Sequence, residues 1–269
     1  MTTIEQDDSK DNETNSQTFI RSLARGLSVL KVFGNRMDGL SSSEIANAAG
    51  LDRATTRRIL LTLQKEKYIR QSDDRYYLTA QILNFGYGYL SALPFWELAQ
   101  PIMKELVAKI HESSSAAVLD AGEAVYVARV RSNTRMVDVS RTVGSRIPAY
   151  CTSLGLVLLA GLSEQEREET LSKITFKKYT EHTITNKKQL CKRLDEIAQQ
   201  GWALSDQELE IGLSSIAVPL HNSKGKVIAA LNVSAQTPRV STDTLINELL
   251  PALKLTAEEI DNAARARAE

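Results

Sequence analysis

Hydrophobic residues first recur at helical spacing from Phe19 onward. Phe19, Leu23 and Leu27 are four positions apart, and Gly34 closes the run. This spacing predicts an amphipathic helix that ends at a glycine. The residues before it, 1–18, carry almost no apolar side chains and cannot bury enough surface to offset the entropy of ordering, so we expect a disordered acidic tail there.

Two more helix patterns and one alternating pattern follow before residue 80. The first reads LSSSEIANAAGL, in which serines can cap a short helix and Gly50 can end it. The second reads LDRATTRRILLTLQKEKYI, where Asp52 is a suitable N-cap for a helix that runs to about Lys67. The stretch IRQSDDRYYLT then alternates around a polar turn, as a short hairpin does. Three helices, a glycine-containing turn between the last two, and a hairpin predict a winged helix-turn-helix over residues 19–80.

Helical angles divide the third of these helices into two sides. Ile59 and Leu63 fall on one side, together with two threonines, while Arg53, Arg57 and Arg58 fall on the other. In a helix-turn-helix, the exposed start of the recognition helix meets base edges, and arginine can bind guanine or phosphate there. The alternative is an exposed helix face that only meets solvent.

Other polar residues of this region are candidates for phosphate contact, although Ser43 and Thr55 could equally be local helix caps. Arg25 could instead face the core end of its helix. The predicted DNA-binding residues are Arg21, Arg25, Ser43, Arg53, Ala54, Thr55, Arg57, Arg58 and Arg75.

The remaining chain has an α+β pattern. Residues 81–94 read as a linker helix that stops at Pro94, and residues 95–269 read as one domain. Its segments predict an amphipathic helix, two strands around an Asp-Ala-Gly-Glu turn, a third strand at 135–141, and a buried apolar helix within TSLGLVLLAGLS. An amphipathic helix ending at Gly201, a hairpin of apolar strands and a long final helix follow. This order predicts a sheet covered by helices, as in a sensor domain.

Charge separates the segments although the formal net charge of the 269 residues is zero. The net charge is −4 over residues 1–18, +5 over 19–80 and −1 over 81–269. A basic segment beside near-neutral ones indicates a polyanion partner. The sequence has no apolar run long enough for a membrane span and no secretory signal, so we expect no membrane association and a cytoplasmic location.

Metal and catalytic chemistry have little support. The two cysteines, Cys151 and Cys191, are far apart, and the three histidines are isolated from each other. No zinc spacing, phosphate-binding glycine motif or nucleophile–base arrangement is present. We therefore expect no cofactor, no metal and no enzymatic activity.

Several long motifs resemble the IclR family of bacterial transcriptional regulators. SLARGLSVLKVFG, IANAAGLDRATTRRILLTLQKEKYI and RYYLT are similar to its DNA-binding domain, and GSRIPAYCTSLGLVLLAG, GWALSDQELEIGLSSIAVPL and VIAALNVSA are similar to its effector domain. The resemblance covers nearly everything after residue 18. It implies a winged helix-turn-helix joined by the linker helix to a GAF-like α/β effector-binding domain, and a homodimer or tetramer. The PAYCTS and DQELE segments are most similar to regulators of the β-ketoadipate pathway, which sense protocatechuate, 4-hydroxybenzoate or related acids.

An anion site is expected where the apolar helix begins near residue 152, because free N–H groups at a helix N-terminus favour a carboxylate. Arg146 could add a charge-assisted pair or be a surface arginine. The resemblance adds the loop 205–215 and the following strand, whose acids could instead be solvated or order a lid. The predicted effector-binding residues are Arg146, Tyr150, Cys151, Thr152, Ser153, Asp206, Glu208, Gly212, Ser214, Ser215, Asn232 and Ser234.

The sequence thus predicts a ligand-responsive regulator that binds double-stranded operator DNA and a small aromatic or dicarboxylic acid. Where some relatives carry a cysteine, this chain has Ser215, which argues against a small 2-oxoacid effector. The alternative is a redox-sensing transcription factor, because the Cys151 thiol sits at a predicted helix N-terminus, where its pKa can be lowered.

Overall fold

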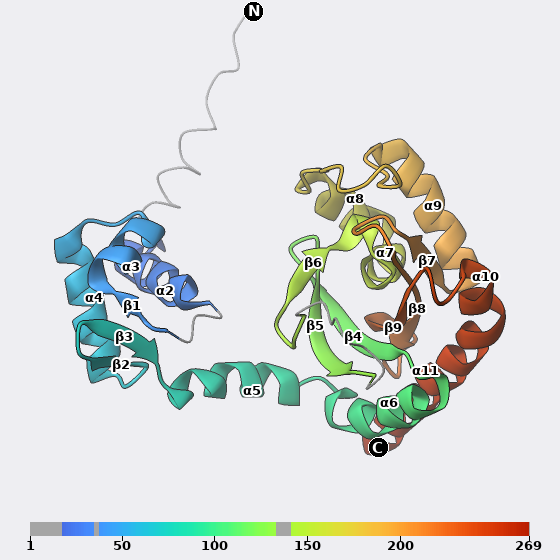
Figure 1. The fold of residues 1–269 in the computed structure, drawn as a ribbon, viewed down its shortest axis with the longest axis horizontal. Helices are drawn as coiled ribbons and strands as arrows, with labels where there is room; N and C mark the ends of the chain where they lie inside the picture. The colour runs from blue at the N-terminus through green and yellow to red at the C-terminus, as the bar shows by residue number, and fades with distance from the viewer. Residues whose placement is uncertain (1–17, 35–37, 133–140, 269) are drawn as a thin grey trace, which may run out of the picture. The chain divides into compact units, whose positions relative to one another are not determined.

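The computed structural model describes residues 18–34, 38–132 and 141–268, and divides the chain between Tyr89 and Leu90 into two compact units (Figure 1). Apart from Thr18, the expected acidic tail lies outside the described residues. The division falls inside the segment that the sequence assigns to the linker helix, which is observed as a short 3-10 turn, η1 (Ala80–Ile82), followed by α5 (Leu83–Ser91).

Between Arg21 and Leu78, the described residues of the first unit form three helices and a three-stranded antiparallel sheet. Its elements are α2 (Arg21–Phe33), β1 (Leu40–Ser41), α3 (Ser42–Ala49), α4 (Arg53–Lys65), β2 (Ile69–Ser72) and β3 (Arg75–Leu78), with strand order β1-β3-β2. The core contains Val29 and Phe33 from α2, Ile45 from α3, Leu60 from α4 and Ile69 from β2. The predicted winged helix-turn-helix is confirmed, and β1 is a short addition that the alternation pattern did not indicate.

Local hydrogen bonds fix the turn between α3 and α4. Ser41 and Glu44 form a reciprocal capping box at the start of α3, and Gly50 ends this helix in the left-handed conformation with φ of 65°. Asp52 then caps α4 by accepting from the Thr55 backbone N–H at 2.8 Å. Hydrogen bonds from the Thr55 backbone and side chain lower the pKa of the Asp52 carboxyl. The sequence signals for both caps therefore correspond to observed bonds.

The second unit is one six-stranded antiparallel sheet with helices on both faces. Its strands are β4 (Ser113–Asp120), β5 (Glu123–Val130), β6 (Arg146–Pro148), β7 (Ala203–Asp206), β8 (Leu213–His221) and β9 (Val227–Gln236), in the order β6-β5-β4-β9-β8-β7. Its helices are α6 (Trp96–Ile110), α7 (Ser153–Ala160), α8 (Glu164–Ser172), α9 (Lys187–Gln200), α10 (Thr242–Thr244) and α11 (Leu250–Ala268), with short turns η2 (Ala149–Cys151) and η3 (Leu245–Leu249).

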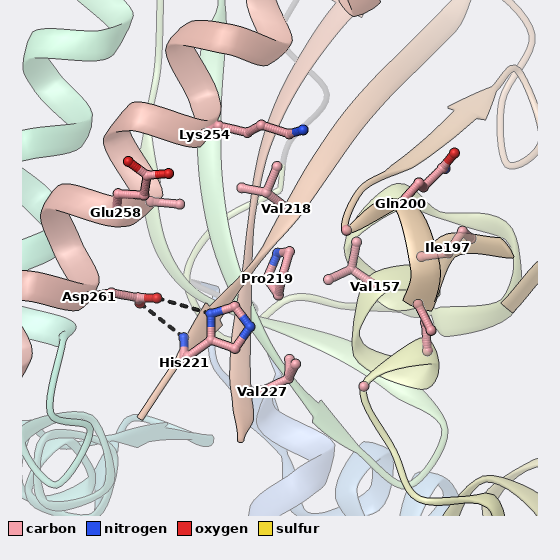
Figure 2. A pocket seen from close by; sticks show the side chains of 15 residues that line it. Val157, Ile197, Gln200, Val218, Pro219, His221, Val227, Lys254, Glu258 and Asp261 are labelled. Atoms are coloured by element: carbon pink, nitrogen blue, oxygen red, sulfur yellow. Dashed lines mark hydrogen bonds and ion pairs between the residues drawn. The ribbon is translucent and has the colours of Figure 1, made fainter. Parts of the chain in front are cut away.

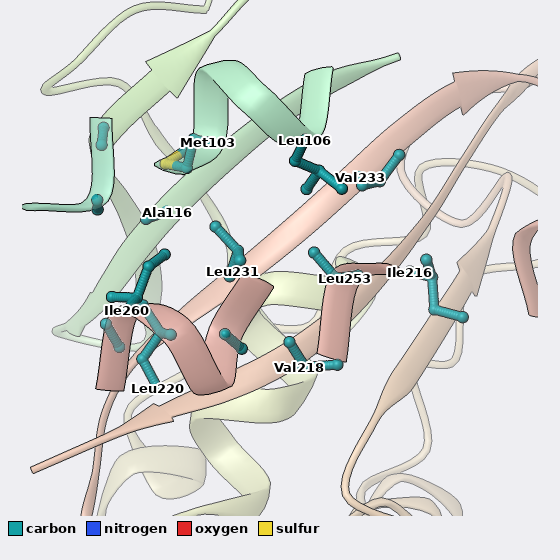
Figure 3. Packing of buried hydrophobic residues seen from close by; sticks show 14 of the residues in the cluster. Met103, Leu106, Ala116, Ile216, Val218, Leu220, Leu231, Val233, Leu253 and Ile260 are labelled. Carbon is teal, nitrogen blue, oxygen red and sulfur yellow. The ribbon is translucent and has the colours of Figure 1, made fainter. Parts of the chain in front are cut away.

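Both faces of the sheet are buried, which explains why β4 and β9 are almost continuously apolar or small rather than alternating. On one face, Met103 and Leu106 of α6 and Leu253 and Ile260 of α11 pack against strand residues such as Leu231 (Figure 3). On the other face, α7 and α9 form a second core with the sheet. This is the mixed α/β effector-type domain that the sequence pattern predicts.

Helix α7 is the most enclosed element of the second unit. All eight of its residues are buried, so no side of it meets solvent. A Cβ on Gly155 would lie 2.1 Å from the Ala149 Cα, because the helix approaches the backbone of η2 at this point. Glycine is therefore required for the packing that positions the first turn of α7.

Some elements differ from the prediction. The sequence pattern does not predict α8 or the short strands β6 and β7, and it predicts one uniform final helix. The helix instead contains the π-helical turn η3 just before Pro251, where the Leu250 N–H donates to the Leu245 carbonyl. The third strand expected at 135–141 lies outside the described residues except for Arg141, which is not in a strand. Among the described residues, no helix has the length and apolarity of a membrane span.

We expect Gly155→Ala to lower the free energy of unfolding by about 3 kcal/mol, because the added methyl group overlaps backbone that cannot rotate away. Gly26→Ala is the matched control. That glycine also lies within a helix, its Cβ would meet nothing within 4 Å, and alanine should stabilise by roughly 0.5–1 kcal/mol. Thermal and denaturant unfolding monitored by circular dichroism measures both; equal effects of the two substitutions would contradict the packing argument.

Candidate functional site

The exposed face of α4 carries the arginines that the sequence pattern assigned to it. Arg53, Arg57 and Arg58 are exposed, while Thr56 and Leu60 are buried with 0% and 1% of their surface accessible. The two-sided division of this helix is confirmed. Exposed Ala54 lies between the arginines and leaves room for a groove wall to approach.

Three other predicted DNA contacts have roles within the protein. Thr55 is buried on the packed side of α4, where the helical angles place it, and its backbone N–H donates to the Asp52 cap, so the structure favours the local-cap alternative over phosphate contact. Ser43 is exposed, and its hydroxyl lies 3.2 Å from that of Ser41. The Arg75 guanidinium donates to the Gly39 carbonyl at 2.9 Å and so ties the hairpin to the loop before β1.

The side chains of Arg21 and Arg25 are exposed along α2. Their exposure permits phosphate contact.

A small cavity lies in the second unit between the start of α7, the edge of the sheet and the loop 207–212. Its volume is about 20 Å³, room for about one water molecule. Half of the predicted effector residues line it: Cys151, Thr152, Ser153, Ser215, Asn232 and Ser234. We call it the α7 cavity.

The first turn of α7 forms one wall of the α7 cavity. The Ser153 hydroxyl donates to the Ser215 hydroxyl at 2.8 Å, and the Thr152 hydroxyl donates backwards to the Pro148 carbonyl at 2.8 Å. Thr152, the N-cap residue, therefore makes no side-chain bond to the first N–H groups of α7. These N–H groups and the positive end of the helix dipole favour an anion.

Arg141 supplies a cation at the same cavity. Its side chain is only 19% exposed, and its Nη2 lies 3.5 Å from the Glu210 Oε2. Sequence reasoning missed Arg141 because it falls at the end of a segment read as a strand, with no motif to distinguish it from other arginines. The other cavity residues that it missed include Tyr126, Ser205, Leu209, Glu210 and Leu213.

Arg146, in contrast, lies outside the α7 cavity, which corrects its predicted role. Its Nε donates to Glu123 at 2.6 Å and its Nη2 donates to Asp120 at 2.7 Å. Hydrogen bonds to Glu123 and then to Asp120 raise the pKa of the Arg146 guanidinium. Arg146 thus ties β6 to the β4–β5 turn.

Tyr150 also has a structural role and does not line the cavity. Its hydroxyl donates to the Lys177 carbonyl and accepts from the Lys177 N–H, both at 2.7 Å. Its ring packs edge-on against Phe176 with centroids 5.0 Å apart. Burial raises the pKa of Tyr150 to about 12, so the phenol stays neutral at physiological pH.

The remaining predicted effector residues shape the loop beside the cavity. The Glu208 carboxylate accepts two bonds from Arg193, at 2.9 and 2.8 Å, and Asp206 accepts from the Ser214 hydroxyl at 2.5 Å. Gly212 adopts φ of 84°, and its N–H donates to the Gln207 side chain. These residues hold the loop 207–212 and do not line the cavity, which matches the alternative of a salt bridge that orders a lid.

A larger groove of about 360 Å³ lies at the opposite end of α7 (Figure 2). Lys254, Glu258 and Asp261 reach it from α11, and Asp261 accepts from the backbone N–H of His221 at 2.9 Å while lying 3.0 Å from its ring Nδ1. Gly161 also lines it. We call it the α11 groove.

Electrostatics decide which of the two spaces suits an acid. The α11 groove meets the C-terminal ends of both α7 and α9, where the partial charge of each helix dipole is negative, and its charged side chains are two carboxylates and the single ammonium group of Lys254. The α7 cavity meets the N-terminal end of α7 and Arg141. A carboxylate is therefore favoured in the α7 cavity, although the groove is larger. No cluster of three or more potential metal ligands occurs among the residues whose placement is described.

Comparison with known proteins identifies two domains in the chain. Residues 22–73 match the IclR helix-turn-helix domain, and residues 87–262 match the bacterial transcriptional regulator IclR C-terminal domain. The chain is 36% identical over 247 residues to the Pca regulon regulatory protein of Pseudomonas putida, covering 92% of this chain and 85% of that protein.

Two further proteins are similar along most of the chain. The p-hydroxybenzoate hydroxylase transcriptional activator of Acinetobacter baylyi is 36% identical over 254 residues, covering 93% of this chain and 94% of that protein. The crystal structure of an IclR homolog from Microbacterium hydrocarbonoxydans, complexed with 4-hydroxybenzoate, superposes with a TM-score of 0.80 at 25% identity, covering 92% of this chain and 100% of the other. The chain belongs to the IclR family of bacterial transcriptional regulators.

Proposed function

We propose that this regulator binds operator DNA through α4 and an aromatic acid such as 4-hydroxybenzoate or protocatechuate through the α7 cavity, and thereby controls genes for aromatic-compound breakdown. The main support for this proposal is that one cavity is lined by the N-terminus of α7, by Arg141 and by several hydroxyl groups. The cavity offers a positive end for a carboxylate and hydrogen-bonding groups for ring hydroxyls.

The relatives support the chemical class of the effector. The Microbacterium homolog binds 4-hydroxybenzoate, and the Pseudomonas and Acinetobacter relatives are named for the pca regulon and p-hydroxybenzoate hydroxylase. An aromatic acid needs more room than the observed 20 Å³, so we infer that residues 209–212 move when it binds. The DNA-bound form belongs in the cytoplasm, where a bacterial chromosome lies.

The DNA surface follows from local charge and geometry. Arg53 and Arg57 are exposed in the first two turns of α4, the part of a recognition helix that meets base edges. Arg58 also borders an apolar groove between α2 and α4. We therefore assign base contact first to Arg53 and Arg57, with Ser43, Arg21, Arg25 and Arg75 as phosphate contacts.

Self-association is the third part of the proposal. Helix α5 has no buried residue, and Leu83, Phe85 and Tyr87 are 59–67% exposed. Leu23 and Leu27 are also exposed along α2, and Phe19 is exposed just before this helix begins. Apolar surface of this extent marks an interaction site, and a second copy of the chain fits a regulator that reads a two-fold symmetric operator. We infer a homodimer formed through these two helices.

Redox sensing through Cys151 is not supported. The Cys151 side chain is fully buried, and burial, followed by repulsion from Glu208, raises the pKa of its thiol to about 12. A reactive cysteine needs a lowered pKa and access to solvent. The helix N-terminus therefore does not activate this thiol.

For DNA recognition, we expect Arg53→Ala combined with Arg57→Ala to weaken operator binding by at least about tenfold, because each arginine contact is worth roughly 1–3 kcal/mol. The salt dependence should also become shallower if a lost contact was to phosphate. Fluorescence anisotropy with promoter DNA at several salt concentrations measures this. Arg265→Ala, an exposed arginine of α11, is the control; equal binding by both variants would remove α4 from the interface.

For effector binding, we expect 4-hydroxybenzoate to raise the unfolding temperature of the wild type, by an amount that grows with the free ligand concentration. Arg141→Gln should abolish the shift, because the carboxylate loses its cation. Arg146→Gln should retain the shift, because Arg146 is paired outside the cavity with Glu123 and Asp120. Loss of the shift in Arg146→Gln but not in Arg141→Gln would contradict the assigned anchor.

For Cys151, we expect slow alkylation by iodoacetamide in the folded protein at pH 8, with the partly exposed Cys191 labelled first. The unfolded thiol ionises near its ordinary pKa of 9.0 and the folded one near 12. Between these two pKa values the unfolded state therefore binds fewer protons than the folded state. The free energy of unfolding should fall as the pH rises from about 9 towards 12. Mass spectrometry measures the labelling; rapid modification of Cys151 would reinstate the redox model.

A further inference from the structure

Arg141 and Glu210 face each other across the α7 cavity. The Arg141 Nη2 and the Glu210 Oε2 are 3.5 Å apart, and both residues line the cavity wall. The Glu210 side chain is 50% exposed, whereas that of Arg141 is 19% exposed. A carboxylate of the protein itself thus approaches the guanidinium that the proposed function assigns to the effector.

Glu208, two positions earlier in the same loop, is held very differently. Its carboxylate accepts two bonds from Arg193 at 2.9 and 2.8 Å, and its side chain is only 5% exposed. The Thr183 hydroxyl also donates to the Glu208 carbonyl at 2.7 Å. A buried, bidentate pair is strong and geometrically fixed, whereas a longer, half-exposed pair is weak. The loop is therefore fixed at Glu208 and can release Glu210.

The cavity does not hold both carboxylates. Its volume of about 20 Å³ is far below that of an aromatic acid, and Glu210 and Leu209 are among the residues that close it. An effector that pairs with Arg141 must therefore take the position of the Glu210 carboxylate and displace this part of the loop.

We propose that Glu210 is an internal competitor of the effector: it neutralises Arg141 and closes the α7 cavity in the unbound protein, and the effector carboxylate replaces it. This inference rests on the proposed function. Glu210 then sets the effector concentration at which the regulator responds. The free energy of effector binding is reduced, because the pair between Glu210 and Arg141 has to break before the effector carboxylate can pair with Arg141. The fixed Glu208 limits the movement to the segment that follows it.

Isothermal titration of the full-length protein with 4-hydroxybenzoate tests the proposal. We expect Glu210→Gln to tighten binding by up to about fivefold, the upper end of the range set by loss of a half-exposed ion pair. Glu210→Asp keeps the charge but shortens the side chain, and should tighten binding similarly because it no longer reaches Arg141. Glu196→Gln removes an exposed acid of α9 that pairs with Lys192 and should leave the affinity unchanged.

The outcomes separate this inference from the proposed function. If the wild type binds the acid and both Glu210 variants bind it no more tightly, the competitor model is wrong while the effector site stands. If Glu210→Gln alone tightens binding, the effect is long-range repulsion and not displacement, and the model is again overturned. If the wild type binds none of 4-hydroxybenzoate, protocatechuate or benzoate, the proposed function fails and this inference fails with it. Hydrogen exchange should also quicken in residues 209–212 on effector binding and in effector-free Glu210→Gln; no change in either would contradict the displacement.

Discussion

The close approach of α7 to the η2 backbone is the constraint on which the second unit depends. Gly155 allows this approach, since any Cβ there would overlap Ala149. With all eight residues buried, α7 has no polar face that could turn towards solvent, so its position between the sheet and α9 is fixed by packing on every side. A helix held in this way has a fixed dipole. Its positive end is directed at the α7 cavity and its negative end at the α11 groove, and this difference is why we propose the smaller space as the site of the acid.

Much of the architecture could be predicted from sequence because its signals are local. The caps at Ser41 and Asp52, the glycine stop at Gly50 and the two-sided spacing of α4 each depend on neighbours within four residues. The apolar helix α7 and its polar first turn were also recognisable. The π-helical turn before Pro251 was not, because the spacing of apolar residues does not distinguish a single π turn from an α-helical one.

The effector site was only half predictable, for a physical reason. A helix N-terminus is a property of one segment, so Thr152 and Ser153 could be found from sequence. The choice between Arg146 and Arg141 depends on which acids lie nearby in three dimensions. Arg146 forms ion pairs with Asp120 and Glu123 at the β4–β5 turn, and its side chain does not line the α7 cavity. Thr55 differs from these arginines: its hydroxyl suits phosphate contact, but its helical spacing and its burial both place it on the packed side of α4.

A regulator responds to a ligand only if the ligand binds one of its states better than another. The α7 cavity, at about 20 Å³, is smaller than an aromatic acid, so the proposed function requires a second state with a wider cavity. In this proposal, effector binding selects a state in which residues 209–212 have moved, and the apparent affinity is reduced by the fraction of molecules in that state. In this proposal, the two glutamates of the loop have different roles. Tight pairing of Glu208 keeps the loop attached in both states, while the looser pair of Glu210 makes the closed state one that an effector can disrupt.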